Sequence, residues 1–296
     1  SLNGTTGEVY KGKVETKAAE VSGDFAALMD LCNKYTKLNV RTNADTPHDA
    51  EVARAFGASG IGLCRTEHMF FDAEKIVAMR EMILSPDVEG RRKALAKLLP
   101  YQKADFKGIF KAMDGCPVNV RLLDPPLHEF VPHDAKGQEE MAKAMGVTVQ
   151  EIKKRVESLC EHNPMLGHRG CRLGNTYPEI TEMQTQAILG AAIELKKEGY
   201  DPHPEIMVPL TGILYEFEAQ EKVIRDAAAA LFEKEGMEIP FKVGTMIEIP
   251  RAALTANRIA SRAEYFSFGT NDLTQMTFGY SRDDIASFLP VYLEKK

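Results

Sequence analysis

The sequence predicts an α/β fold, a (β/α)8 TIM barrel that stops before its last strand. From Leu38 onward, short β-prone apolar runs alternate with helical segments over about 250 residues, the rhythm of such a barrel. No glycine-rich GxGxxG string follows the first expected strand, which argues against a dinucleotide-binding fold. After Asp272 we expect only a loop and a short helix, Asp284–Leu293, so that the eighth strand is missing.

Seven strands are expected, and the carboxyl end of each should lie at one edge of the sheet. In order they are Leu38–Asn43, Gly60–Thr66, Val118–Leu123, Leu166–Arg172, Glu205–Leu210, Lys242–Glu248 and Tyr265–Phe268. The fourth is the weakest because its surroundings are rich in glycine. The fifth is apolar after its first residue, as is typical of a strand buried on both faces.

Helices fill the intervals between the strands, and two of them carry clear signals at their N-termini. Thr46 before Pro47 predicts the start of a helix that ends at Phe56. Thr148 and Glu151 predict a capping box. The other expected helices are Phe25–Tyr35, Ala73–Leu84, a stretch from Ser85 to Met113, Glu179–Lys197, Leu214–Glu235 closed by Gly236, and Arg251–Arg262.

The domain organisation follows from this rhythm. Residues 1–37 are expected to be the end of a preceding domain and a linker, and residues 38–296 the incomplete barrel. Residues 128–163 interrupt the alternation and predict a helical insertion on the face that carries the strand ends.

The composition excludes several classes of protein. A net charge of −6 argues against nucleic acid as a partner. No apolar run approaches the roughly 18–20 residues that span a membrane. Five irregularly spaced cysteines indicate neither a disulfide framework nor a zinc site. We therefore expect a reducing compartment, the cytoplasm, with a plastid or other organelle left open.

Two carboxylates end neighbouring strands of the last β–helix–β unit. Glu248 closes one strand and Asp272 follows the next, so the two should lie side by side. Two hard oxygen ligands, too few to cage an ion alone, suit Mg²⁺ completed by substrate oxygens. On this segment alone, the alternative that each carboxylate caps a nearby helix has equal weight.

Arginines also mark the expected strands. Arg41, Arg65, Arg121 and Arg169 lie in or at the ends of strands, where an unpaired guanidinium is costly. Their convergence favours an anionic ligand, since guanidinium groups bind phosphate and carboxylate bidentately. Arg65 and Arg121 are the best candidates. The alternative is structural ion pairing with Glu67, Asp124 or Glu205.

Histidine and cysteine give weaker signals. His68, His128 and His168 lack the spacing of a metal site and are interpreted as hydrogen-bonding residues. Cys64 should face away from Arg65 by strand alternation and is assigned to packing. Cys171 stays ambiguous.

Five strings of the chain carry a resemblance to a known family. They are GIGLCRTEHMFF at Gly60–Phe71, VRLLDPPLHEFVP at Val120–Pro132, NPMLGHRGCRL at Asn163–Leu173, GTMIEIPRAA at Gly244–Ala253 and FSFGTNDLTQ at Phe266–Gln275. Together they resemble the phosphoenolpyruvate-utilising enzymes over nearly the whole chain from Leu38. The DPPLHEF string is most similar to the dikinase branch. Phosphoenolpyruvate synthase and enzyme I of the sugar phosphotransferase system share some of these strings.

The resemblance implies a phosphotransferase of three parts, in which a swivelling phosphohistidine carries phosphate from an ATP-binding domain to a barrel that exchanges it with pyruvate. It implies that Glu248 and Asp272 hold Mg²⁺ and that Arg65 and Arg121 grip the phosphoryl group. Residues Gly269, Thr270, Asn271 and Asp272 would line the pyruvate pocket, and Arg282 would lie near the phosphate.

The same resemblance implies partners for the chain. Residues 1–37 would include the end of the phosphohistidine domain, and two barrels would pair as a homodimer. The family's cysteine proton donor belongs to a CGEHGG-type string that the chain lacks. We therefore expect this chain alone to bind substrate at best.

Two alternatives remain open. The first is the barrel of a phosphoenolpyruvate synthase or of an enzyme I. The second, from another class, is a non-catalytic module for anion binding or dimerisation, in which Glu248 and Asp272 would matter for stability but not for ligand affinity.

Overall fold

A computed structural model describes residues 1–4, 6–14, 21–282 and 284–295 of the chain. Its centre is a six-stranded, fully parallel sheet in which the strands lie in chain order, β1 to β6. The strands are β1 (Thr42–Asn43), β2 (Ile61–Arg65), β3 (Pro117–Arg121), β4 (His203–Val208), β5 (Lys242–Ile247) and β6 (Phe266–Phe268). The α/β class that the sequence predicted is confirmed.

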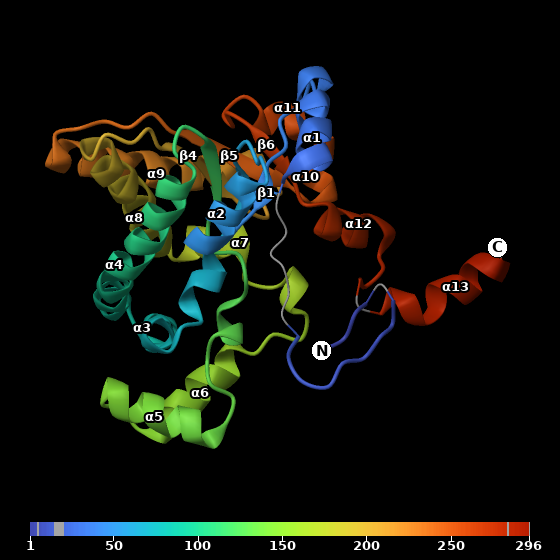
Figure 1. The fold of residues 1–296 in the computed structure, drawn as a ribbon. Helices are drawn as coiled ribbons and strands as arrows, with labels where there is room; N and C mark the ends of the chain where they lie inside the picture. Colours follow the sequence, from blue (N-terminus) through green and yellow to red (C-terminus); the bar gives the residue numbers. More distant parts are fainter. Residues whose placement is uncertain (5, 15–20, 283, 296) are drawn as a thin grey trace.

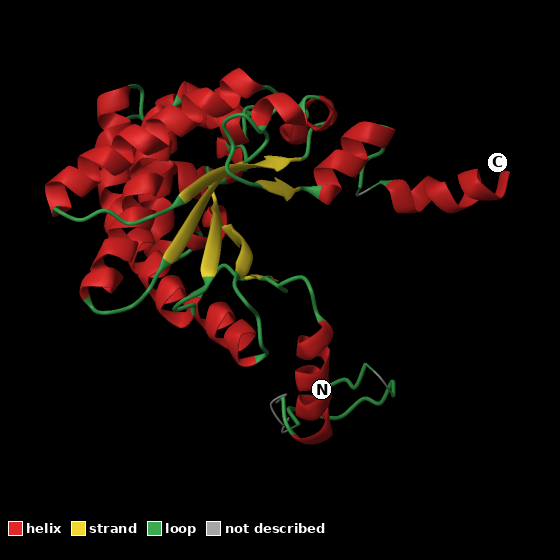
Figure 2. Ribbon diagram, turned by 90° about the horizontal axis from the view of Figure 1, so that it is seen from above, coloured by secondary structure: helices red, strands yellow, loops and turns green. Residues whose placement is uncertain are grey.

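The α-helices that connect the strands lie mainly along one side of the sheet (Figures 1 and 2), and others precede β1 or follow β6. They are α1 (Gly23–Tyr35), α2 (Pro47–Ala55), α3 (Ala73–Leu84), α4 (Val88–Ala112), α5 (Ala135–Met145), α6 (Val149–Leu159), α7 (Gly170–Thr176), α8 (Pro178–Lys197), α9 (Leu214–Glu235), α10 (Pro250–Leu254), α11 (Ala256–Ile259), α12 (Thr270–Phe278) and α13 (Ile285–Lys295). Short 3-10 helices occupy Thr66–Phe70, Leu127–Glu129 and Pro164–Leu166.

The sheet is strongly curled. β1 and β4 are three positions apart in the strand order, which in a flat sheet separates them by about 14 Å. Yet Arg41, next to β1, pairs through Nη1 with Oε2 of Glu205 in β4 at 2.6 Å. Similarly, Oη of Tyr265, just before β6, donates to Oδ1 of Asn119 in β3 at 2.9 Å. Both contacts cross the inner face and require curvature.

Two apolar cores support the sheet. The larger one joins the strands to the inner faces of α4, α8 and α9, with Phe106, Ile188 and Phe217 fully buried. The smaller one lies beneath α3, α5 and α6, and contains Met79 and Phe130. α5 and α6 extend from the body at the lower edge of Figure 1. The second core attaches this helical pair to the edge that carries the strand ends.

The end signals of the helices are confirmed. The side chain of Thr46 accepts a hydrogen bond from the backbone N–H of Asp49 at 3.1 Å, with Pro47 opening α2. Thr148 and Glu151 form both bonds of the capping box of α6. α9 spans Leu214–Glu235 as expected, and Gly236 ends it in the left-handed conformation.

The expected strand Leu166–Arg172 is wrong. This segment is the end of a 3-10 helix followed by α7, so the sheet has six strands in the described residues rather than seven. The backbone N–H groups of Gly170 and Cys171 donate to the carbonyl oxygens of Asp124 and Pro209, at 2.9 and 3.0 Å. The segment therefore caps the ends of β3 and β4 instead of pairing beside them.

Other boundaries also differ from the predictions. β1 keeps only the last two residues of the expected strand. The expected helix Arg251–Arg262 divides into α10 and α11 at Thr255. The residues after Asp272, expected as a loop, continue α12 as far as Phe278. Among the described residues, no helix combines the length and apolarity needed to cross a membrane. Residues 15–20 of the expected linker lie outside the described part of the chain.

Candidate active site

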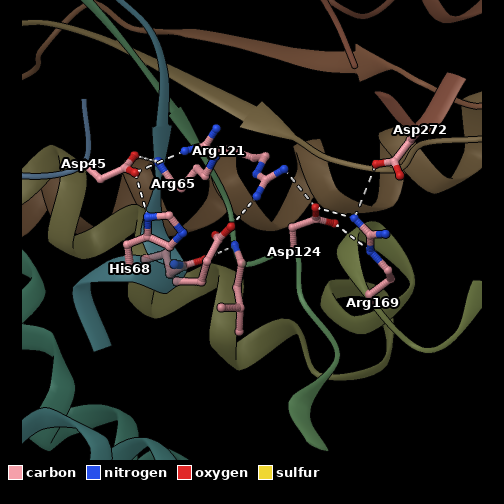
Figure 3. Close-up of polar contacts among 10 residues, drawn as sticks. Asp45, Arg65, His68, Arg121, Asp124, Arg169 and Asp272 are labelled. Atoms are coloured by element: carbon pink, nitrogen blue, oxygen red, sulfur yellow. Dashed lines mark hydrogen bonds and ion pairs between the residues drawn. The ribbon is translucent and has the colours of Figure 1, made fainter. Parts of the chain in front are cut away.

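The carboxyl edge of the sheet carries two groups of ion pairs, one around Asp45 and one around Asp124 (Figure 3). Asp45 lies two residues after β1. One carboxylate oxygen of Asp45 accepts the backbone N–H of Arg65 at 2.7 Å, and the other lies 3.4 Å from Nη1 of Arg65 and 2.7 Å from Nδ1 of His68. Arg65 ends β2, and its side chain remains 35% exposed. Asp45 therefore anchors Arg65 while leaving the guanidinium open to a ligand.

Arg121 is the next cation along the edge. It is the register partner of Arg65 on the neighbouring strand, so parallel pairing alone aligns the two arginines. Its guanidinium contacts Glu67 and pairs through Nη1 with Oδ2 of Asp124 at 2.9 Å. Burial by itself lowers the pKa of Arg121, but the carboxylates of Asp124, Glu67 and Glu248 outweigh burial and raise it. Arg121 is therefore a firmly charged, buried group.

Arg169, at the N-terminus of α7, is the second arginine that binds Asp124. Its Nε and Nη2 donate to the two carboxylate oxygens of Asp124 at 3.2 and 2.6 Å. Nη2 also lies 3.6 Å from Oδ2 of Asp272 in the first turn of α12. Asp124 is only 1% exposed. It therefore joins two arginines from different elements in one buried cluster.

Glu248 follows β5 and is the most deeply buried carboxylate of the pair that the sequence singled out, at 1% exposure. The backbone N–H of Leu210 donates to its Oε1 at 2.6 Å. Burial, the charge of Asp124 and the adjacent Asp272 raise the pKa of Glu248 from 4.5 to about 8, against the lowering effect of the Leu210 bond. Glu248 and Asp272 thus lie side by side, as expected from the parallel strand ends.

The charges of this cluster do not balance. Glu67, Asp124 and Asp272 contact the guanidinium groups of Arg121 and Arg169, and Glu248 lies close enough for its charge to act on both. Four carboxyl groups therefore face two guanidinium groups. Burial is the largest cause of the raised pKa of Glu248, and the negative charges of Asp124 and Asp272 add to it. Among the described residues there is no group of three or more acidic, histidine or cysteine side chains arranged to hold a metal ion alone. A cation here would need further oxygen ligands.

The remaining predicted site residues divide into two sets. Gly269 packs against Glu248, since a Cβ on Gly269 would overlap the Glu248 carboxylate. Thr270 and Asn271 instead line a groove of about 610 Å³ between α12 and α13. Arg282 follows α12, lines the same groove and donates its backbone N–H to Gln275. The structure therefore brings Gly269 and Asp272 to the carboxylate cluster, and the others to its side.

Arg41 lies elsewhere. Its ion pair with Glu205 is at the amino half of the sheet, because Glu205 precedes the carboxyl end of β4 by three residues. The structural alternative left open by the sequence therefore holds for Arg41.

The interpretation of the histidines as hydrogen-bonding residues is confirmed for His68 and His168, whereas Nδ1 of His128 is buried without a hydrogen-bond partner among the described residues. His68 contacts Asp45, and Nε2 of His168 bonds Oγ1 of Thr176 at 2.9 Å. Cys64 is fully buried in the larger core, and burial raises its pKa well above the ordinary value. Cys171, the ambiguous one, donates its thiol to the carbonyl oxygen of Leu210 at 3.2 Å, and burial raises its pKa to about 12. Neither thiol is a nucleophile.

Sequence reasoning missed two features of the edge. Asp45 follows an expected strand just as Asp272 does, so the same rule of strand ends would have found it. The left-handed backbone of Leu210, with φ of 60°, has no signal in the sequence because leucine rarely adopts it.

The fold and this edge define a class, parallel α/β proteins with arginines and carboxylates gathered at the carboxyl ends of the strands. The family model described as "PEP-utilising enzyme, PEP-binding domain" matches residues 19–292. The chain belongs to this family of phosphoenolpyruvate-utilising enzymes.

Similar curated proteins are named pyruvate, phosphate dikinase. The chain is 56% identical to that of Clostridium symbiosum, over 100% of the chain and 34% of the relative. It is 57% identical to that of Giardia intestinalis, over 100% and 33%, and 57% identical to the chloroplastic protein 1 of Oryza sativa subsp. japonica, over 100% and 32%. The chain thus spans about a third of the length of these relatives.

Proposed function

We propose that the chain is the phosphoenolpyruvate- and pyruvate-binding part of a pyruvate, phosphate dikinase, which transfers a phosphoryl group between a phosphohistidine and pyruvate. The observation that carries the proposal is the charge-imbalanced cluster of Glu248, Asp272 and Asp124 beside two arginines. Such a cluster suits a substrate that is bound as an anion together with a divalent cation. The names of the 55–57% identical relatives support the same substrate class.

Glu248 and Asp272 would hold Mg²⁺. Their fit is supported by the burial of Glu248 and by the nearby charges of Asp124 and Asp272, which raise its pKa, since a bound cation would stabilise the ionised form. Two carboxylates leave most of the coordination positions to substrate oxygens and water, as Mg²⁺ prefers. When bound, Mg²⁺ supplies Lewis acidity toward the oxygens of the substrate.

The arginines would bind the phosphoryl group. Arg65 is held by Asp45 but is 35% exposed, so its free nitrogens can reach a ligand at the edge. Arg121 lies beside it in register and is fixed by Glu67 and Asp124. Held in place in advance, two guanidinium groups neutralise a transferring phosphoryl group without reorganisation. Because Gly269 has no side chain, a ligand could come close to Glu248 at this position. Thr270, Asn271 and Asp272 would line the pyruvate side of the site.

The experiment is Mg²⁺-dependent binding of oxalate, a mimic of enolpyruvate, measured by calorimetry. Binding that requires Mg²⁺ and is lost in Asp272→Ala supports the proposal. A folded wild-type chain that binds no oxalate at millimolar Mg²⁺ overturns it. Unchanged affinity with altered stability in Asp272→Ala would favour the non-catalytic module instead.

The larger assembly is part of the proposal. We propose that the curled sheet forms the first six strands of a (β/α)8 barrel, which the ion pair between Arg41 and Glu205 across its inner face supports. A phosphohistidine domain of the same longer chain would deliver the phosphoryl group, and two copies would pair as a homodimer. The proposed location is the cytoplasm or a plastid, since some relatives are named chloroplastic. Sedimentation of a longer chain at several concentrations tests the pairing.

A further inference from the structure

We propose that the backbone N–H of Leu210 is a positioning group for the Glu248 carboxylate, and that Gly170 and Cys171 at the start of α7 hold it in place. The inference rests on the proposed function, because it concerns how the proposed metal carboxylate is aimed. It assigns a role to the loop after β4 and to the glycine–cysteine pair of α7.

The conformation of Leu210 is the first observation. Leu210 is the only non-glycine residue with positive φ among the described residues, at 60°. A left-handed conformation is unfavourable for a leucine because its Cβ crowds the backbone, so it persists only where the surroundings fix it. Leu210 is fully buried, and its N–H points to Oε1 of Glu248 at 2.6 Å. The strained residue therefore makes a short hydrogen bond to a buried carboxyl group.

α7 supplies the surroundings that fix Leu210. Cys171 donates its backbone N–H to the carbonyl oxygen of Pro209 at 3.0 Å and its thiol to that of Leu210 at 3.2 Å. Gly170 is itself left-handed, with φ of 57°, and a Cβ there would lie 2.6 Å from Cβ of Leu210. Only glycine allows this approach. Two left-handed residues thus pack directly against each other.

The same helix start reaches the other strand ends. The N–H of Gly170 donates to the carbonyl oxygen of Asp124 at 2.9 Å, and the Arg169 side chain binds the Asp124 carboxylate. The first residues of α7 therefore link the ends of β3 and β4 and, through the Leu210 bond, Glu248 after β5.

The consequence for Glu248 concerns its two oxygens. Oε1 is occupied by the N–H of Leu210, whereas Oε2 faces Gly269 at the start of α12, on the side of Asp272. One oxygen fixes the carboxylate and the other remains for a cation. Without the Leu210 bond the carboxylate could rotate, and neither of its oxygens would be held in a fixed position.

A double-mutant cycle tests the arrangement. The variants are Gly170→Ala, Leu210→Gly and the double variant, and the readout is the dissociation constant of oxalate with Mg²⁺ together with the melting temperature. Gly170→Ala should displace Leu210 and weaken binding at least tenfold. Leu210→Gly keeps the N–H and should stay within threefold of wild type. The double variant removes the overlap between the two Cβ atoms and should regain at least half of the lost affinity on a logarithmic scale.

Gly146→Ala is the matched control. Gly146 ends α5 with φ of 67°, and a Cβ there meets no atom within 4 Å. Gly146→Ala should lower the melting temperature through backbone strain alone and leave oxalate affinity unchanged. If Gly170→Ala lowers only the melting temperature, as the control does, the positioning role is overturned.

A second measurement separates this inference from the proposed function. In the metal-free chain, hydrogen exchange of the Leu210 amide should be at least tenfold slower in wild type than in Glu248→Ala. Equal rates would overturn the inference even if oxalate binds. Slow exchange in a chain that fails to bind oxalate with Mg²⁺ would uphold the positioning bond and overturn the proposed function alone.

Discussion

Arg169 binds Asp124 through two parallel hydrogen bonds, Nε to Oδ1 at 3.2 Å and Nη2 to Oδ2 at 2.6 Å. The pair joins the start of α7 to the segment after β3, although 45 residues separate the two in the chain. Because Asp124 also binds Arg121, one buried carboxylate holds two guanidinium groups in fixed positions. The five predictions below concern this cluster, the contacts around it and the separate pair of Arg41 with Glu205.

Asp124→Asn should strongly destabilise the chain. The substitution removes the negative charge shared by two buried guanidinium groups, and breaking a buried pair costs about 3 kcal/mol or more. Urea unfolding of the metal-free chain measures the loss. Glu157→Gln is the control, because its ion pair with Lys153 is exposed and should contribute less than about 0.5 kcal/mol. Equal effects of the two substitutions would contradict the cluster.

Mg²⁺ binding should depend on pH through Glu248. The metal-free pKa of Glu248 is about 8, so below that pH the cation must displace a proton. Apparent affinity should rise about tenfold per pH unit from pH 6 toward 8 and then level off. Calorimetry in buffers of different ionisation enthalpy should detect one proton released per Mg²⁺ at pH 6.5. Release of no proton would contradict the prediction.

The stability of the metal-free chain should change in the opposite direction. The folded state keeps the Glu248 proton up to about pH 8, whereas the unfolded chain releases it near 4.5. Between these values unfolding releases a proton, so the contribution of this group to stability falls as pH rises. Glu248→Gln cannot ionise and should remove this part of the pH dependence, which urea unfolding at several pH values would measure.

Arg41→Met should separate stability from ligand binding. Arg41 pairs with Glu205, which is only 7% exposed, so its removal leaves a largely buried carboxylate without its partner. The free energy of unfolding should fall by about 1–2 kcal/mol, less than for a fully buried pair because Arg41 is partly exposed. Oxalate affinity should remain within twofold of wild type. The double variant Arg41→Met with Glu205→Gln should regain part of the stability. A tenfold loss of oxalate affinity in Arg41→Met would contradict this assignment and show that Arg41 contributes to the anion site.

Gly269→Ala should abolish metal-dependent oxalate binding. The added methyl group would overlap the Glu248 carboxylate and lie 2.8 Å from Sδ of Met246. The backbone at Gly269 has φ of −86°, so any loss comes from the contact and not from backbone strain. Gly190→Ala is the matched control, because its methyl group meets only the flexible end of Lys103 and should stabilise α8. Equal affinity in both variants would remove Gly269 from the site.

The sequence by itself determined the features that depend on neighbours within a few residues. The caps of α2 and α6 and the end of α9 were predictable because each involves side chains and backbone groups less than one turn apart. The pairing of Glu248 with Asp272 was also predictable, since consecutive parallel strands must place their ends at one edge.

Only the tertiary structure decided which charged side chains pair and which backbone conformations the residues around them adopt. Leu166–Arg172 was the weakest of the expected strands, and no place in the sheet remains for it between β3 and β4, which pair directly. The segment becomes α7 and caps their ends. Arg41 and Glu205 lie 164 residues apart and meet only because the sheet curls. The left-handed Leu210 is unfavourable by local preference and is fixed by contacts with α7. Long-range packing outweighs local preference at these positions, because several contacts together exceed the small energy differences between backbone conformations.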